Sequence, residues 1–595
     1  MNDRNSFTKR IYALLALAGI IFSIFAIRLI DVQAVQAKGF AQRASNEMWN
    51  SSTLLAPRGT ITDVNGLELA RSVAAVNVVV DQTMITDPQT TASVTAPVFG
   101  MDTQAVAALL TGTKRYQIIV KQAAPAVWTK LNQVLDSYNK TVMKERGGVA
   151  KRIVGFFSER SYVRDYPTGR LAASLVGIIN DAGVGASGLE SSMESILAGK
   201  NGRYDYANGA GAIIPGSQQF ITEAKPGTGI QLTIDRDVQW VAQNAISAAV
   251  KSTGAASGTV IVMDPKSGEI LAQASAPNFD PNNKKSIKVE SLRNPAVQDA
   301  YEPGSTGKII TVASAIEEGK ITPETVWTIP YAFKVGKSTF HDAEKHKTER
   351  LTTAGVLAQS SNVGAIQIGA LMSSDTLYSY LRKFGIGQST GSHLPGESAG
   401  ILPRVDSWSG STAPTIAFGQ GYSVTALQAT SVFATIANDG VRVAPNVIAG
   451  TIDGSGSFTA SHPRATERVV SSETARQMRL IMESVVSEKG TAPAAAIPGY
   501  RIAGKTGTAQ RVDPTCHCYK GYTSSFIGFA PADQPRYVVS VVIQNPIGQH
   551  FGGVIAAPVF KTVMSFVLQS KHIPPTKPNK VTYALDEAAL TKKKA

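Results

Sequence analysis

The 595-residue chain predicts an α+β fold in its C-terminal half, with an antiparallel sheet flanked by helices. Apolar segments at 259–264 and 269–275 surround the turn residues 265–268, which is typical of a β-hairpin. The valine-rich residues 537–544 indicate another strand, whereas residues 238–250 have helical spacing. Two further strands are expected at 501–510 and 524–529, and a further helix near 556–568.

The N-terminus carries an uncharged apolar run of about 17 residues, at 11–27, which is near the short limit for a membrane-spanning helix. Basic residues stand on both sides of this run, and no cleavage site of the Ala-x-Ala kind follows it. We therefore expect residues 11–30 to form an uncleaved transmembrane signal anchor, with residues 1–10 in the cytoplasm and the remaining chain outside. A cleaved signal peptide is the alternative.

Composition narrows the class of protein. A hydrophobic content of 43% with 17% charged residues is typical of folded protein rather than of a disordered chain. The net charge is +14, but the basic residues are dispersed and no nucleic-acid motif accompanies them. We expect no nucleic-acid partner. The positive charge fits an exported protein that works near anionic polymers, and it fits equally well a charge that only keeps the protein soluble.

The two cysteines, Cys516 and Cys518, are separated only by His517. Two cysteines cannot supply a disulfide framework for a chain of this length. A structural zinc site needs four ligands at wider spacing, so a metal is the less favoured reading and no metal site is predicted. The segment is expected to be a loop that holds either two thiols or a local disulfide.

Three short motifs carry the chemistry of this sequence: Ser305-Thr-Gly-Lys308, Ser360-Ser-Asn362 and Lys505-Thr-Gly-Thr508. Together they supply a nucleophile beside a lysine, a proton relay and an anion site, which is the set used by active-site serine acyltransferases. Ser-x-x-Lys recurs at Ser6–Lys9 and Ser137–Lys140, where nothing accompanies it. The order and surroundings of the three motifs therefore carry the prediction.

The first motif follows a Pro-Gly turn and opens an apolar stretch with helical character. Ser305 would lie at a helix start, where free backbone N–H groups favour developing negative charge. Lys308 would stand over the same face one turn later. A neutral lysine can activate a serine if burial or a second cation lowers its pKa, and Lys505 is the natural second cation. The alternative is a serine helix cap with a surface lysine.

The other two motifs complete the predicted site. Ser360 is expected to pass a proton between Lys308 and a leaving group, and Asn362 to bind a peptide amide, although a turn or helix cap would explain the same residues. In the third motif Thr506 and Thr508 share one face of a strand, so both hydroxyls can meet a substrate carboxylate. Lys505 would reach round the strand edge. Gly507 indicates a close approach, and a backbone N–H here could form an oxyanion hole with that of Ser305.

These motifs, with others in the same order, resemble those of the class B penicillin-binding proteins over almost the whole chain. The N-terminal half adds Pro57–Gly66, Arg164–Pro167 with Gly169, and Gly188–Glu190, and the C-terminal half adds Val262–Leu271, Arg293-Asn294 and Phe418–Thr425. The resemblance implies a β-lactamase/transpeptidase-like domain at 226–570 on an elongated mixed pedestal of dimerisation type at 40–225. Residues 571–595, rich in Pro, Lys and polar residues, are expected to be a flexible tail.

The resemblance also implies the reaction. Ser305 would attack the penultimate D-alanine carbonyl of a peptidoglycan stem peptide with Lys308 as base, while Lys505, Thr506 and Thr508 hold the terminal carboxylate. An amine from a neighbouring strand would then take the acyl group and form the cross-link. β-Lactam antibiotics would acylate the same serine, and no cofactor is implied.

Within the class, residues 499–510 and 488–491 look more like the septal enzyme of cell division than the elongation enzyme, which is the runner-up. A septal role implies a membrane glycan polymerase and small bitopic division proteins as partners, at a bacterial cell membrane that the chain crosses once. A β-lactam sensor and a hydrolase, either a β-lactamase or a D,D-carboxypeptidase, are the alternatives from other functional classes.

Overall fold

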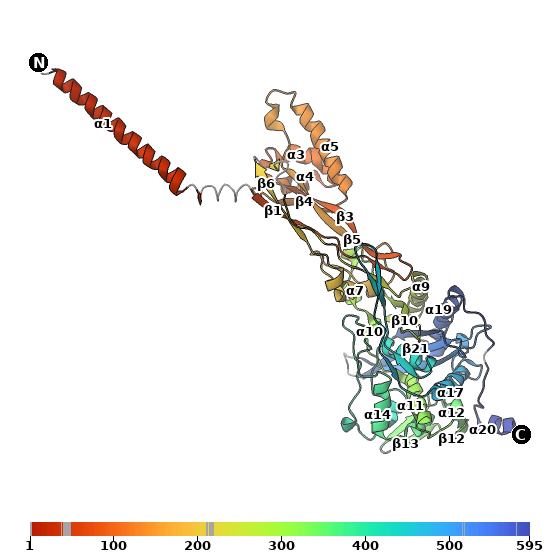
Figure 1. Cartoon of the computed structure of the whole chain (residues 1–595). Helices are drawn as coiled ribbons and strands as arrows, with labels where there is room; N and C mark the ends of the chain where they lie inside the picture. The colour runs from red at the N-terminus through yellow and green to blue at the C-terminus, as the bar shows by residue number, and fades with distance from the viewer. Residues whose placement is uncertain are drawn as a thin grey trace. The chain divides into compact units, whose positions relative to one another are not determined.

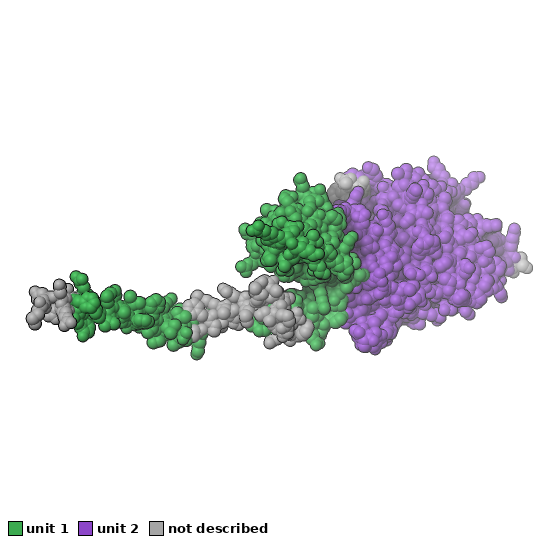
Figure 2. All heavy atoms as spheres, turned by 90° about the horizontal axis from the view of Figure 1, so that it is seen from above, with its two compact units in different colours: residues 1–57, 73–163, 199–226 green, residues 58–72, 164–198, 227–595 purple. Residues whose placement is uncertain are grey.

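The computed structural model describes residues 3–36, 38–39, 49–209, 212–213, 219–513, 516, 518–578 and 580–594. The chain forms two compact units, each built from separate stretches of sequence (Figures 1 and 2). The first comprises residues 1–57, 73–163 and 199–226, and the second comprises residues 58–72, 164–198 and 227–595.

The chain begins with the helix α1 (Asp3–Ile30), drawn in red in Figure 1, which runs on into a π-helical turn (Asp31–Val35). Its apolar part, Phe7–Val35, spans 29 residues with no buried side chains and is long and apolar enough to cross a membrane. The predicted apolar helix is therefore present. It is longer than the uncharged run because it continues through Arg28, whose guanidinium pairs with the Asp31 carboxylate at 2.6 Å.

The first unit combines short helices with antiparallel strands. The side chains of Asp87 and Asp102 accept backbone N–H groups and so cap two of its helices. Its described elements are β1 (Trp49–Leu54), the end of β3 (Glu68–Val80), α3 (Pro88–Phe99), α4 (Thr103–Leu110), β4 (Gln117–Ala123), α5 (Pro125–Val142), β5 (Phe156–Asp165), β6 (Gly202–Gly209), β7 (Ala212–Ile213) and β8 (Gln219–Thr222). Two small apolar clusters around Val78 and Val80 form its core.

A five-stranded antiparallel sheet forms the centre of the second unit. Its strand order is β11 (Ile270–Ala276), β10 (Ser257–Met263), β22 (Tyr537–Gln544), β21 (Cys518–Ala530) and β20 (Ala503–Asp513). The predicted antiparallel sheet is confirmed, including the hairpin of β10 and β11. The strands expected at 501–510 and 524–529 prove longer, because β20 and β21 pair as far as Asp513 and Cys518, with a register shift between Gln510 and Val512.

Helices cover both faces of this sheet, as the α+β prediction requires. Alternate residues of β10 face opposite ways: Val260 and Val262 join one apolar cluster, whereas Ile261 and Met263 join another. The helices α9 (Arg236–Thr253) and α19 (Ala557–Ser570) pack on the first face. The second face is covered by α11 (Lys308–Glu317), α16 (Ala426–Ala437) and α17 (Ser472–Glu483).

Three of the N-terminal motifs meet in one buried ion cluster of the second unit. The Glu190 carboxylate is fully buried and accepts from Arg58 at 2.6 Å and from Arg164 at 2.7 Å. Arg58 also pairs with Glu194 at 2.6 Å. Losing one partner of such a buried pair costs about 3–5 kcal/mol because the other charge stays uncompensated. These motif residues therefore hold segments 58–72 and 164–198 together.

The prediction of a flexible C-terminal tail is wrong for residues 571–578 and 580–594. This segment docks along the second unit and ends in α20 (Glu587–Lys594). Thr352 donates its backbone N–H to the Leu585 carbonyl at 3.0 Å and its hydroxyl to the Ala584 carbonyl at 2.6 Å. The Arg350 guanidinium meets the Glu587 carboxylate at 2.9 Å. The polar composition did not indicate this docking, because backbone hydrogen bonds and a few single side chains, such as Leu585 and Glu587, make the contact.

A Leu585→Ala substitution should lower the thermal stability of the second unit. The Leu585 side chain is buried, so truncation should cost about 2 kcal/mol, whereas the exposed Lys592→Ala should change stability by less than about 0.5 kcal/mol. Calorimetric unfolding of the detergent-solubilised chain measures both variants. If Leu585→Ala melts at the same temperature as the native chain, the tail does not dock in solution.

Candidate active site

The nucleophile candidate lies in a single 3₁₀ turn, η6 (Gly304–Gly307), which leads directly into α11. The sequence predicts Ser305 at the helix start, but it lies half-buried in this 3₁₀ turn, and the α-helix begins three residues later, at Lys308. Gly304 has a φ of +54°, and a Cβ built on it would lie 2.9 Å from the Ala509 Cβ. The glycine therefore lets β20 approach the turn that carries Ser305.

Lys308 is completely buried and points at the second motif. Its Nζ donates to the Asn362 Oδ1 at 2.8 Å and to the Ser360 carbonyl at 2.5 Å, and lies 3.3 Å from the Ser360 Oγ. Burial lowers the pKa of this amine to about 7, although the nearby Asp342 carboxylate acts in the opposite direction. A large fraction of Lys308 is therefore neutral near neutral pH and able to accept a proton.

Lys505 reaches the same hydroxyl from β20. Its Nζ donates to the Ser360 Oγ at 2.8 Å and to the Thr506 Oγ1 at 3.2 Å, and the side chain is completely buried. Burial, with the Lys308 charge as a second cause, holds the pKa of Lys505 well below its usual range. The Ser360 hydroxyl thus lies between two amines, and burial lowers the pKa of both. This arrangement can move a proton across Ser360.

The backbone at Ser360 is held in an uncommon conformation. Its φ of +63° lies in the left-handed region, which costs free energy for a residue other than glycine. The residue joins α12 (Thr353–Ala358) to α13 (Asn362–Gly369). Ser361 donates its N–H to the Val356 carbonyl at 2.9 Å, and its hydroxyl caps α13. These contacts hold the Ser360 carbonyl and hydroxyl towards Lys308.

Asp342 supports this segment and was missed by the sequence reasoning. It follows β14 (Ser338–His341), and its carboxylate accepts from the backbone N–H groups of Asn362 at 2.5 Å and Val363 at 2.9 Å. The Ser361 hydroxyl donates to it at 2.8 Å, and His346 lies 3.1 Å away. No motif marks Asp342, because it stands about 20 residues before the segment it supports and only the tertiary fold joins them.

The strand β20 presents the third motif beside the nucleophile turn. The Thr506 hydroxyl lies 2.9 Å from that of Thr491, and the Thr508 hydroxyl accepts the Gly552 N–H at 3.1 Å. A Cβ on Gly507 would collide with the Ser525 hydroxyl, so the predicted close approach is real. Thr491 was used in the sequence analysis only as part of a subfamily motif. The structure adds it to the set of hydroxyls at the predicted carboxylate site.

Asn362 is more engaged within the protein than the sequence analysis expected. Its Oδ1 accepts from Lys308, and its Nδ2 donates to the His341 carbonyl at 3.0 Å. One amide hydrogen on Nδ2 is left for a bound peptide. The side chain therefore orients the lysine first and can contact a substrate second.

A hairpin tip lies next to the segment before the nucleophile. The Glu302 carboxylate accepts the Gly421 N–H at 3.0 Å and the Tyr519 hydroxyl at 3.3 Å, and burial raises its pKa.

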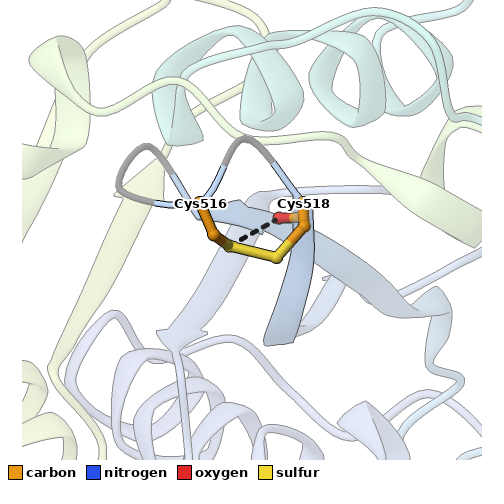
Figure 3. Close-up of a disulfide and its surroundings, with 2 residues drawn as sticks. All are labelled: Cys516 and Cys518. Carbon is orange, nitrogen blue, oxygen red and sulfur yellow. Dashed lines mark hydrogen bonds between the residues drawn. A yellow bond between two sulfur atoms is a disulfide. The ribbon is translucent and has the colours of Figure 1, made fainter.

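Beside Tyr519, Cys516 and Cys518 form a disulfide (Figure 3). Of the two alternatives from the sequence, the local disulfide is therefore the one observed. His517 lies outside the described residues. Among the described residues, no group of three or more His, Cys, Asp or Glu is arranged to hold a metal ion.

The layered fold and this arrangement of serine and lysine define an active-site serine acyltransferase. Residues 258–565 match the family model of the penicillin-binding protein transpeptidase domain, and residues 53–232 match that of the penicillin-binding protein dimerisation domain. The chain belongs to the class B penicillin-binding proteins, which confirms the family predicted from the motifs.

Curated relatives and solved structures agree with this family. Penicillin-binding protein PbpB of Mycolicibacterium smegmatis is 37% identical, over 93% of this chain and 88% of its own length. Peptidoglycan D,D-transpeptidase FtsI of Buchnera aphidicola is 30% identical, over 95% of this chain and 96% of its own. The crystal structure of penicillin-binding protein 3 from Mycobacterium tuberculosis with aztreonam has a TM-score of 0.69 at 32% identity, covering 90% of this chain and 100% of that one.

Proposed function

We propose that this protein is a serine-type peptidoglycan D,D-transpeptidase in which Ser305 is the nucleophile. The observation that carries the proposal is the Ser360 hydroxyl held between the buried amines of Lys308 and Lys505, in a chain whose relatives include a named D,D-transpeptidase. Neutral Lys308 takes the Ser305 proton as Oγ bonds to the penultimate D-alanine carbonyl. The C–N bond to the terminal D-alanine then breaks, and its amine receives a proton through Ser360.

The second half of the reaction returns the serine. An amine from a neighbouring stem peptide attacks the acyl-serine carbonyl and gives its proton to the lysine–serine relay. The C–O bond to Ser305 then breaks, Oγ takes a proton back from the relay, and the new amide is the cross-link. Lys505, Thr506 and Thr508, joined by Thr491, bind the terminal carboxylate before it leaves, while Gly507 lets β20 pack closely against Ser525. The backbone N–H groups of Ser305 and of β20 stabilise the oxyanion. Residues 226–570 form the catalytic domain in this proposal, and residues 40–225 form the pedestal.

A time course of fluorescent penicillin labelling tests this proposal on the detergent-solubilised full chain. A label that forms and persists for many minutes supports an acyl-serine transferase, whereas rapid loss to water would identify a β-lactamase or D,D-carboxypeptidase. The same preparation, given a lipid-linked glycan with its stem peptides and a glycan polymerase, should release D-alanine and form cross-linked products. Labelling without any cross-linked product would instead indicate a β-lactam sensor.

We infer that the enzyme acts in septal wall synthesis from a single membrane anchor, α1, with residues 1–10 in the cytoplasm. The motif residues 499–510 and 488–491 and the likeness to the relative named FtsI support this role over elongation. The expected partners are a membrane glycan polymerase and small bitopic division proteins. A fluorescent fusion should gather at mid-cell during constriction; a distribution along the side wall would favour the elongation role.

A further inference from the structure

We propose that Asp342 is a positioning residue that holds the Ser360–Asn362 segment in place and puts a negative charge beside the residue that binds Lys308, Asn362. This inference deepens the proposed function and rests on Ser305 being the acylated residue. It goes beyond the three motifs, because Asp342 belongs to none of them. Two observations carry it: the hydrogen bonds that the carboxylate accepts, and its charge, which acts on the buried Lys308 amine.

The hydrogen bonds that Asp342 accepts hold the residues at the start of α13 in position. One oxygen accepts the backbone N–H groups of both Asn362 and Val363, and the other accepts the Ser361 hydroxyl. These donors lie at the start of α13, where backbone N–H groups have no partner within the helix. Asp342 therefore fixes the positions of Ser361 and Asn362, the two residues that follow the left-handed Ser360.

Pinning those residues fixes the atoms that Lys308 contacts. The Ser360 carbonyl and the Asn362 Oδ1 both accept from the lysine Nζ, and neither could keep this geometry if the start of α13 shifted. The left-handed backbone of Ser360 needs such support, since it is unfavourable by itself. Loss of Asp342 should therefore misplace the proton relay without removing any residue of it.

The charges around the lysine pair give Asp342 its second role. Burial lowers the pKa of Lys308 and the Asp342 charge raises it, whereas burial and the Lys308 charge both lower the pKa of Lys505. His346 is hydrogen-bonded to Asp342 and to the Lys347 carbonyl. Burial disfavours its charged form, but these hydrogen bonds and the Asp342 and Glu349 charges raise the pKa of His346. A protonated His346 partly offsets the Asp342 charge. The Asp342 carboxylate and the protonated His346 imidazole therefore shift the pKa of Lys308 in opposite directions.

The test is the pH profile of acylation by a fluorescent penicillin, measured on the full chain in detergent from about pH 5 to about pH 9. Asp342→Asn keeps oxygen and nitrogen atoms of similar shape but removes the charge. The acidic limb of its pH profile should move to lower pH by about half a unit to one unit, because Lys308 then loses its proton at a lower pH. Asp342→Ala loses the supporting bonds as well, and it should acylate about tenfold more slowly, or worse, at every pH.

The His346→Gln variant should shift the pH profile in the opposite direction. Removing the imidazolium leaves the Asp342 charge without an offset, so the acidic limb should move to higher pH. The control is Asp453→Asn in the hairpin of β17 (Ile448–Ile452) and β18 (Phe458–Ala460). Asp453 also caps a turn by accepting backbone N–H groups of Ser455 and Ser457, and its replacement should leave the profile unchanged.

The outcomes separate this inference from the proposed function. The role of Asp342 is overturned if the acidic limb of the Asp342→Asn pH profile coincides with that of the native chain. It is also overturned if the Asp342→Ala chain acylates at the native rate. A folded native chain that takes no label at Ser305 overturns the proposed function itself. If Asp342→Ala fails to fold, the opposite shifts of Asp342→Asn and His346→Gln still decide the question.

Discussion

A Ser305→Ala chain should form no covalent adduct with a fluorescent penicillin under conditions in which the native chain is fully labelled. Alanine has no hydroxyl, and loss of the nucleophile from a serine enzyme removes activity by about six orders of magnitude. The fold should be retained, because the half-buried Ser305 loses only one oxygen atom. Denaturing gel fluorescence measures the adduct, and the thermal midpoint checks folding.

The chain contains a matched control for this substitution. Ser137 is followed by Lys140 at the same spacing, but it lies on α5, where its hydroxyl donates to the Gln133 carbonyl. Ser137→Ala should label like the native chain. A residual adduct on Ser305→Ala, mapped by mass spectrometry to another residue, would contradict the assignment of the nucleophile.

A Lys308→Met chain should acylate about 10²- to 10⁴-fold more slowly than the native chain, which is the usual contribution of a general base. Methionine fills similar space without an amine, and a buried polar group is costly to desolvate. The free energy of unfolding should therefore stay the same or rise. Stopped-flow labelling measures the rate, and Lys140→Met at the exposed end of α5 is the control. A rate within threefold of native would exclude Lys308 as the base.

The depressed pKa of Lys308 also predicts the pH dependence of the native chain. Because the neutral amine is the base, acylation should rise as the pH passes through about 7 and then level off. The unfolded chain, with a lysine pKa of about 10.4, binds more protons than the folded chain between these two values. The free energy of unfolding should therefore increase with pH from about 7 towards 10, and Lys308→Met should weaken this increase.

Much of the fold and site could be predicted from local patterns. The apolar run near the N-terminus, the turn at 265–268 and the valine-rich strand each report on one element, and all three elements are present. The order of Ser305, Lys308, Ser360 and Lys505 indicated one shared site, and hydrogen bonds join the two lysines to Ser360. The catalytic roles of these residues stay predictions until the variants above are measured.

Other features depended on contacts that no local pattern records. Asp342 and Thr491 resemble many other polar residues until the fold brings them to α13 and β20. Polar composition at 571–595 predicted flexibility, but backbone bonds to Thr352 dock that segment.

The sequence by itself determined the family, the chemistry of the motifs and the types of the main elements, because each depends on residue type and short spacing. The tertiary structure alone decided which carboxylate supports the start of α13, which of the two cysteine states forms and where the tail lies. Those features arise from packing between segments that are distant in sequence, where burial and charge act through space rather than along the chain.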